Sequence, residues 1–156
     1  MDGIKKTISI PTNNERAFLS FVDGFNDWWP REYTWSRNTL EKIYIDGRKN
    51  GLCTEIGPFN FRCDWGRVID YQENEKLTIS WQISPKREPI PDPDQASIIT
   101  LEFERVAADI TIVKFWHTDF DKHGDEGENY REMLDSEMGW DYILNCYKSY
   151  VSPSEV

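Results

Sequence analysis

Apolar and polar side chains alternate along most of the chain between residues 40 and 116, and this period of two restricts the fold more than any other feature. Leu77, Ile79, Trp81 and Ile83, for example, are interleaved with polar residues. Successive side chains of a strand point to opposite faces, so this pattern predicts strands with one dry and one solvated face, as in antiparallel sheets. The expected strands cover residues 40–45, 52–56, 59–69, 77–83, 98–106 and 110–116.

The first forty residues predict one more strand and two short helices. Isoleucines alternate with polar residues over 4–10, and Pro11 ends this strand. Thr12 or Asn13 can cap a helix over residues 14–22. A second helical turn ends at Trp28-Trp29-Pro30, because proline disfavours helix in the residue before it.

The C-terminal part predicts one long helix, because apolar residues from Tyr130 to Tyr147 recur at helical spacing. Asp125 and Glu128 resemble a capping box at its start. A strongly twisted antiparallel sheet of about seven strands curls, and one helix about 10–12 Å across cannot fill its concave face. We therefore expect one α+β domain over residues 1–156, in which the curved sheet and the long helix enclose a cavity.

Residues 84–95 hold four of the eight prolines of the chain, and so many prolines exclude a central strand. This segment is predicted to be a long exposed loop. Together with the segment Trp28–Trp35, it is expected to form the mouth of the cavity.

An excess of acidic residues narrows the range of partners. The chain has 28 acidic and 18 basic residues and a net charge of −10, which argues against nucleic acid and against insertion into anionic membranes. The first residues lack the apolar stretch of a secretory signal, so a cytoplasmic location is expected. Cys53, Cys63 and Cys146 have no metal-ligand spacing and are expected to be free thiols; we expect no metal and no other cofactor.

Several short motifs, in this order along the chain, resemble one known superfamily. They are Ile8-Ser9-Ile10-Pro11, Ala17-Phe18, Trp28-Trp29-Pro30, Gly66-Arg67-Val68, Leu77–Trp81, Thr111–His117 and Gly139-Trp140. The set resembles the START-like and polyketide-cyclase (SRPBCC) superfamily, and within it the AHSA-type bacterial relatives of the activator of heat-shock protein 90 ATPase. The resemblance implies a Bet v 1-like helix-grip fold that holds a ligand. Chaperone activators of this family carry an additional N-terminal domain for which this sequence has no room, so a chaperone partner is not expected.

Aromatic residues make up 14% of the chain, and its tryptophans, Trp116 among them, could converge on one concavity. Trp65 and Trp81 are the strongest candidates, because both lie on the dry faces of alternating strands. The alternative is that these rings only fill the core. The residues expected to contact a ligand are Trp29, Trp35, Phe61, Trp65, Trp81, His117, Met133 and Trp140.

Polar candidates for a reaction are fewer. His117 lies at the end of a predicted strand, where it could act as a general acid or base or donate a hydrogen bond to a ligand; a structural histidine is the alternative. Tyr130, on the inner stripe of the last helix, is a second catalytic candidate. A carboxylate–guanidinium site could be formed by Glu55, Arg62, Asp64 and Arg67. Alternation places Arg62 and Asp64 on the solvated face, which predicts a surface ion pair instead.

Three functions are open. The first is a binding protein for a small hydrophobic molecule, which the aromatic content and the inferred cavity favour. The second is a cavity enzyme of cyclase, dehydratase or hydrolase type, in which His117 or a tyrosine moves protons. The third is a chaperone-associated interaction module, by analogy with the chaperone activators. Neither the ligand nor the presence of a homodimer is decided by the sequence.

Overall fold

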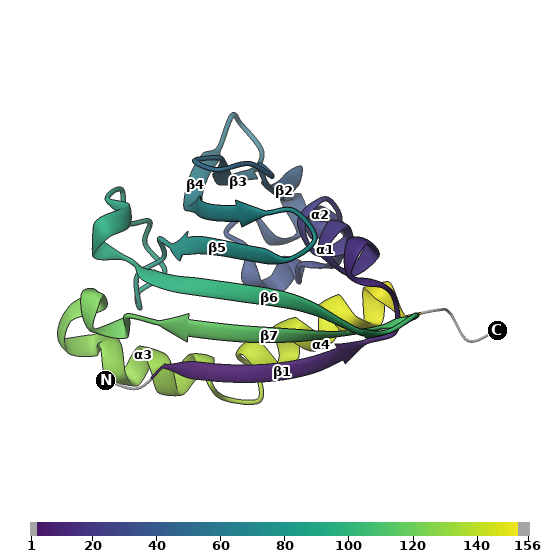
Figure 1. The fold of residues 1–156 in the computed structure, drawn as a ribbon. Coiled ribbons are helices and arrows are strands. Elements are labelled where there is room, and N and C mark those ends of the chain that lie inside the picture. The colour runs from purple at the N-terminus through teal and green to yellow at the C-terminus, as the bar shows by residue number, and fades with distance from the viewer. Residues whose placement is uncertain (1–2, 153–156) are drawn as a thin grey trace.

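Seven strands form one antiparallel sheet in the computed structural model, which describes residues 3–152 (Figure 1). The strands are β1 (Ile4–Ile10), β2 (Lys42–Ile45), β3 (Leu52–Ile56), β4 (Arg62–Gln72), β5 (Lys76–Trp81), β6 (Ser97–Ala107) and β7 (Ile110–Thr118). They are hydrogen bonded in the order β1-β7-β6-β5-β4-β3-β2, so β1 pairs with β7 and the other strands form a meander. The predicted number and arrangement of strands are confirmed.

Four helices accompany the sheet: α1 (Asn14–Val22), α2 (Phe25–Trp28), α3 (Gly127–Leu134) and α4 (Trp140–Val151). Short 3₁₀ turns are η1 (Arg31–Tyr33), η2 (Arg37–Thr39), η3 (Pro93–Gln95) and η4 (Phe120–Glu126). Asn13 caps α1, as predicted, because its side-chain oxygen accepts a hydrogen bond from the Arg16 amide at 2.8 Å. None of the helices between residues 3 and 152 is long and apolar enough to cross a membrane.

The core lies between one face of the sheet and the helices. Phe18 of α1 packs edge-on against Phe103 of β6, with ring centroids 5.1 Å apart. Tyr147 of α4 is fully buried beside Phe21 and donates its hydroxyl to the Ala17 carbonyl at 2.6 Å. In Figure 1, α1 and α3 lie toward opposite ends of the sheet, and α4 runs between them. These contacts place the aromatic core between the sheet and the helices α1 and α4.

The C-terminal helical segment differs from the prediction, because residues 135–139 divide it into α3 and α4. The Gly139 amide donates to the Ser136 carbonyl at 2.9 Å, and a Cβ at Gly139 would overlap the Leu134 carbonyl. The sharp turn therefore needs glycine at this position. The predicted capping box is wrong, because Asp125 lies within η4 and α3 begins after Glu126 without a side-chain cap. Apolar spacing continues on both sides of the break, so periodicity alone did not reveal it.

The strand predicted over 59–69 begins later and is irregular. Phe59 is fully exposed in a turn with φ of 57°, and Phe61 is 38% exposed before β4 begins at Arg62. The pairing of β4 with β3 skips Trp65 between Asp64 and Gly66, and this bulge reverses the alternation, so that Val68 is buried and Ile69 is exposed. The placement of Phe59, Phe61 and Ile69 on the dry face is therefore wrong, whereas Cys63 and Trp65 are buried there as expected.

The segment 84–95 is a loop, as its prolines predicted. An isolated bridge joins Pro89 of this segment to Ile83 just before it, and the segment contains the 3₁₀ turn η3.

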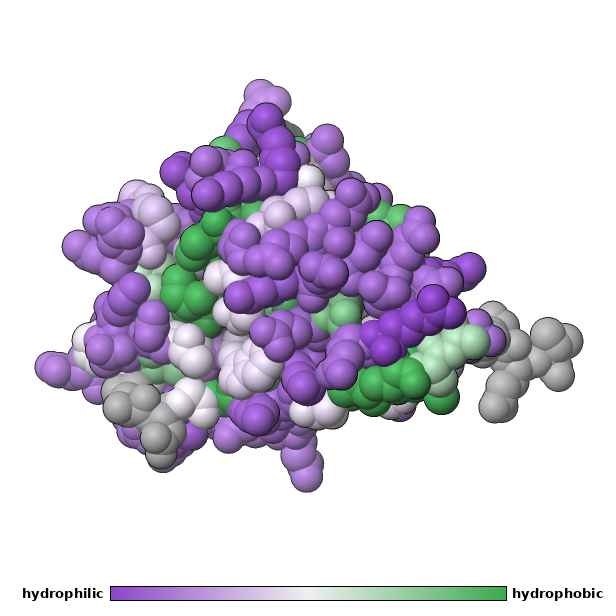
Figure 2. Space-filling view, viewed as in Figure 1, coloured by the Kyte–Doolittle hydropathy of each residue, from purple (hydrophilic) through white to green (hydrophobic). Residues whose placement is uncertain are grey.

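The face of the molecule drawn in Figure 2 is mostly hydrophilic, in keeping with the net charge of −10.

Candidate functional site

Four tryptophans from distant parts of the chain meet beside the end of β5. Ring centroids are 6.3 Å apart for Trp29 and Trp81, 6.1 Å for Trp65 and Trp81, and 5.4 Å for Trp81 and Trp140. Trp116 does not join them, because it is partly exposed and lies under the Lys5 ammonium. The convergence expected from the sequence is therefore centred on Trp81, which is in contact with the other three rings.

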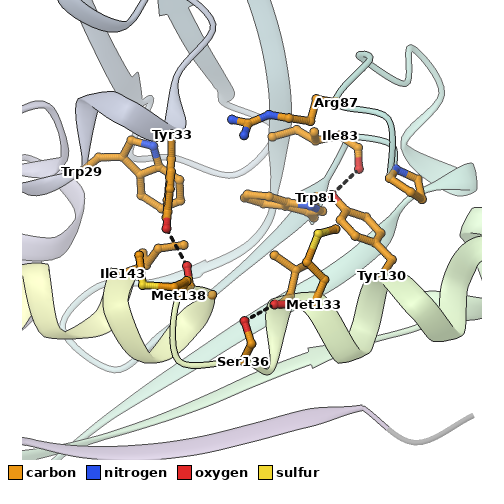
Figure 3. A pocket seen from close by; sticks show the side chains of 13 residues that line it. Trp29, Tyr33, Trp81, Ile83, Arg87, Tyr130, Met133, Ser136, Met138 and Ile143 are labelled. Atoms are coloured by element: carbon orange, nitrogen blue, oxygen red, sulfur yellow. Dashed lines mark hydrogen bonds between the residues drawn. The ribbon is translucent and has the colours of Figure 1, made fainter.

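A pocket of about 320 Å³ opens beside this cluster (Figure 3). Its walls come from the chain after α2, from η1, from the end of β5 with the loop that follows, and from α3, the α3–α4 turn and α4. The lining residues are Trp29, Tyr33, Trp81, Ile83, Pro85, Arg87, Tyr130, Met133, Leu134, Ser136, Met138, Gly139 and Ile143. Apolar and aromatic side chains dominate this lining, as is usual for small-molecule sites.

The predicted contact residues are distributed around this pocket in two groups. Trp29, Trp81, Met133 and the catalytic candidate Tyr130 belong to its lining. The remaining predicted residues, which lie behind the lining or outside it, are Trp35, Phe61, Trp65, His117 and Trp140. Tyr33 and Arg87, which also line the pocket, belong to the two segments predicted to form its mouth, but the turns that carry them have no periodic pattern that would single out these residues.

Hydroxyl groups of the pocket are engaged by backbone carbonyls. Tyr130 accepts a hydrogen bond from the Trp81 indole at 2.6 Å and donates to the Ile83 carbonyl at 2.8 Å. Tyr33 donates to the Met138 carbonyl, and Ser136 to the Met133 carbonyl, both at 2.6 Å. Burial raises the pKa of Tyr130 well above its ordinary value, so its hydroxyl stays protonated at neutral pH. The Trp81–Tyr130 bond fixes two walls of the pocket relative to each other.

Replacing Tyr130 with phenylalanine is expected to lower the free energy of unfolding by about 1.5 kcal/mol, because the Trp81 indole and the Ile83 carbonyl lose their partner. Urea unfolding measures the change. Tyr150→Phe is the control, since the Tyr150 hydroxyl makes one exposed bond of 3.3 Å to Asp27 and its loss is expected to change stability by less than about 0.5 kcal/mol. Equal effects of the two substitutions would contradict the role of Tyr130.

A buried chain of hydrogen bonds lies behind Trp81. Ser97 Oγ lies 2.7 Å from Nε2 of His117 and 2.6 Å from Nε2 of His123, and the Trp140 indole donates to Nδ1 of His117 at 3.0 Å. An indole nitrogen can only donate, so Nδ1 of His117 accepts and its Nε2 carries the proton. His117 then donates to Ser97, and the Ser97 hydroxyl is left to donate to His123.

His117 is therefore a buried structural group in this arrangement. Both its ring nitrogens are engaged, it is fully buried, and it does not belong to the pocket lining. Burial, together with the nearby His123, lowers the pKa of His117 well below its ordinary value, and burial also lowers the pKa of His123. This position argues against direct proton transfer between His117 and a ligand in the pocket.

The carboxylate–guanidinium site that Glu55, Arg62, Asp64 and Arg67 could have formed is not present, and the surface ion pair predicted in its place is. Glu55 is fully buried and accepts hydrogen bonds from the backbone amides of Trp35 and Ser36. Arg62 and Asp64 form an exposed pair at 3.2 Å, as alternation predicted. Glu55 thus holds the chain beside the pocket mouth, a role that its place in a strand did not reveal.

Comparisons with known proteins agree with this architecture. No protein-family model matches the chain, and no curated protein is significantly similar to it. Among solved structures, the anthrahydroquino-gamma-pyrone synthase Txn09, complexed with SUM, has a TM-score of 0.69 at 22% identity over 97% of both chains. The chain has the helix-grip fold.

Two further solved structures share the helix-grip fold with this chain. The self-sacrificing resistance protein CalC from Micromonospora echinospora has a TM-score of 0.65 at 22% identity, covering 96% of this chain and 93% of its own. The Aha1 dimer from Colwellia psychrerythraea has a TM-score of 0.63 at 17% identity, covering 97% of this chain and 96% of its own. At these identities the likeness extends to the fold alone, so the helix-grip fold that the resemblance implied is confirmed.

Proposed function

We propose that this helix-grip protein binds a small, mainly apolar molecule in the pocket beside Trp81. The observation that carries the proposal is the pocket itself: about 320 Å³, lined by aromatic and aliphatic side chains, and within the size range of small-molecule sites. The bond between Trp81 and Tyr130 supports it, because a wall that is already rigid loses little conformational freedom when a ligand binds.

The hydrogen bonds made by the polar groups of the pocket favour ligand binding over catalysis. The hydroxyls of Tyr33, Tyr130 and Ser136 are all donated to backbone carbonyls. His117, one candidate for moving protons, lies behind the lining with both nitrogens bonded. Txn09, which shares the fold, is a synthase, so a cavity of this kind is compatible with catalysis in another chain. A cytoplasmic location remains a prediction.

A fluorescence titration with N-phenylnaphthylamine, an uncharged aromatic probe that brightens in apolar surroundings, tests the proposal. We expect saturable binding with a Kd on the order of 10 μM. Met133→Trp, which adds a large ring at the mouth, is expected to weaken binding about tenfold, because the added ring takes space that the probe needs. Val106→Trp is the matched control, since Met133 and Val106 are both 54% exposed and Val106 lies outside the pocket.

The two tryptophan variants separate pocket binding from adsorption to the surface. Loss of binding in Met133→Trp with unchanged binding in Val106→Trp supports the pocket. Absence of saturable binding to the unmodified protein, or equal behaviour of the two variants, would overturn the proposal.

A further inference from the structure

Arg87 carries the only charge among the described residues that line the pocket. Its guanidinium extends across the mouth from the side of Ile83 toward Tyr33 (Figure 3). Three arginines elsewhere are paired with carboxylates: Arg48 with Asp46, Arg62 with Asp64 and Arg131 with Glu128. Within residues 3–152, the Arg87 guanidinium has no such partner, so the pocket presents an uncompensated cation above apolar walls.

The backbone at Arg87 is held in place by its neighbours. Its amide donates to the Ser84 carbonyl at 2.8 Å, and its carbonyl accepts from the Trp35 indole at 2.8 Å. The Ser84 amide in turn donates to the Glu88 carbonyl at 2.8 Å. Arg87 itself has a φ of 63°, in the left-handed region. The root of the side chain is therefore fixed at the mouth, and only the side chain needs to be ordered when a ligand arrives.

The charge of Arg87 acts on the interior of the pocket. Burial raises the pKa of Tyr130 and, together with the charge of Glu32, that of Tyr33, and the positive charge of Arg87 opposes the rise in each case. An electrostatic interaction is stronger beside apolar walls than in water. A guanidinium also matches the planar, two-oxygen geometry of a carboxylate. The mouth of the pocket thus combines an aromatic wall with a donor suited to an anionic oxygen group.

We infer that the ligand of this pocket is a flat, mainly apolar molecule that carries one anionic oxygen group, such as a carboxylate or a phenolate, held by Arg87. The apolar part lies against Trp81 and Trp29, and the anionic group remains at the mouth. This inference rests on the proposed function and adds a charge requirement to it. On a protein with a net charge of −10, Arg87 gives an anion a local site of attraction.

Two probes that share one aromatic skeleton test the charge requirement. N-phenylnaphthylamine is neutral, and anilinonaphthalenesulfonate is the same skeleton with a sulfonate, which stands in for the anionic group. We expect Arg87→Gln to weaken the binding of the sulfonate about tenfold and that of the neutral probe by less than about threefold. Lys86→Gln is the matched control, because it removes one positive charge from the same loop at a residue outside the lining.

The outcomes separate this inference from the proposed function. A selective loss of sulfonate binding in Arg87→Gln, absent in Lys86→Gln and in the charge-retaining Arg87→Lys, supports the inference. Equal changes for both probes, or an equal loss in Lys86→Gln, would overturn it while the pocket proposal stands. If neither probe binds the unmodified protein, both fail. Near-ultraviolet circular dichroism of each variant shows that the fold is retained.

Discussion

Replacing Glu55 with alanine is expected to lower the free energy of unfolding by about 3 kcal/mol, the largest effect of a single substitution in this account. The Glu55 carboxylate is fully buried on β3 and accepts three hydrogen bonds, from the Trp35 amide at 3.1 Å and from the Ser36 amide and hydroxyl at 2.8 Å each. Alanine leaves all three donors without an acceptor. Bonds to a charged acceptor are worth more than neutral ones, so their joint loss is expected to be large.

Chemical denaturation at neutral pH measures this loss. Glutamine has nearly the same shape as glutamate, but its side-chain NH₂ group is itself a donor and would face the donors of Trp35 or Ser36. Glu55→Gln is therefore expected to lower the free energy of unfolding by about 2 kcal/mol. Glu41→Ala is the control, because Glu41 is exposed and its removal is expected to change stability by less than about 0.5 kcal/mol. If Glu55→Ala unfolds at the same denaturant concentration as Glu41→Ala, the anchoring role assigned to Glu55 is wrong.

The hydrogen bonds of Glu55 also support the mouth of the pocket. Trp35, held by Glu55 through its amide, donates its indole N–H to the Arg87 carbonyl. A chain of contacts thus joins a buried strand residue to the cation at the pocket mouth. Trp35 lies outside the pocket lining, where its indole supports the backbone of the residue that lines the mouth.

Acidification from about pH 7.5 to about pH 5.5 is expected to lower the free energy of unfolding by about 2 kcal/mol. The chain has two histidines, and the pKa of each is lowered in the folded protein by burial. Unfolded histidine titrates near about 6.5, so below that pH the unfolded state binds protons that the folded state excludes. The stability that neutral His117 and His123 contribute is therefore complete above this value and is lost as the pH falls. Each histidine contributes at most about 1.4 kcal/mol to this loss of stability per pH unit.

Urea unfolding at several pH values across this range tests the histidine chain. His123→Gln removes one titrating group, so the slope of stability against pH is expected to fall, by at most about half. The comparison with His123→Gln isolates the contribution of this histidine, because the other titrating groups are common to both proteins. A stability that stays constant over the range in the unmodified protein would mean that the folded state takes up protons at His117 and His123 as readily as the unfolded chain does.

Much of the fold could be predicted because strand alternation is a local property. Leu77, Ile79 and Trp81 lie in β5 with their side chains buried, as their spacing required. Prediction failed where a single residue changes the local geometry. Gly139 allows the turn between α3 and α4, and the bulge at Trp65 shifts Ile69 to the exposed side.

The site was less predictable, because its polar parts come from segments that meet only after folding. Ser97, His117 and His123 are hydrogen bonded although they belong to β6, β7 and η4. No spacing along the chain signals such a network. Arg87 lies in a loop whose prolines predicted exposure and gave no indication of where the guanidinium points. Trp29 and Trp81 could be named as candidates from the sequence because large aromatic residues mark either a core or a pocket. In the structure both side chains are buried in the core and also line the pocket.

The most direct test of ligand binding beside Trp81 is a nuclear magnetic resonance titration of ¹⁵N-labelled protein with N-phenylnaphthylamine, observing the indole N–H signals of the seven tryptophans. The signals of Trp29 and Trp81, which line the pocket, are expected to shift with saturation, whereas that of Trp116, beneath Lys5, is expected to stay in place. Indole signals that all stay in place, or a shift of Trp116 as large as that of Trp81, would contradict the pocket as the binding site.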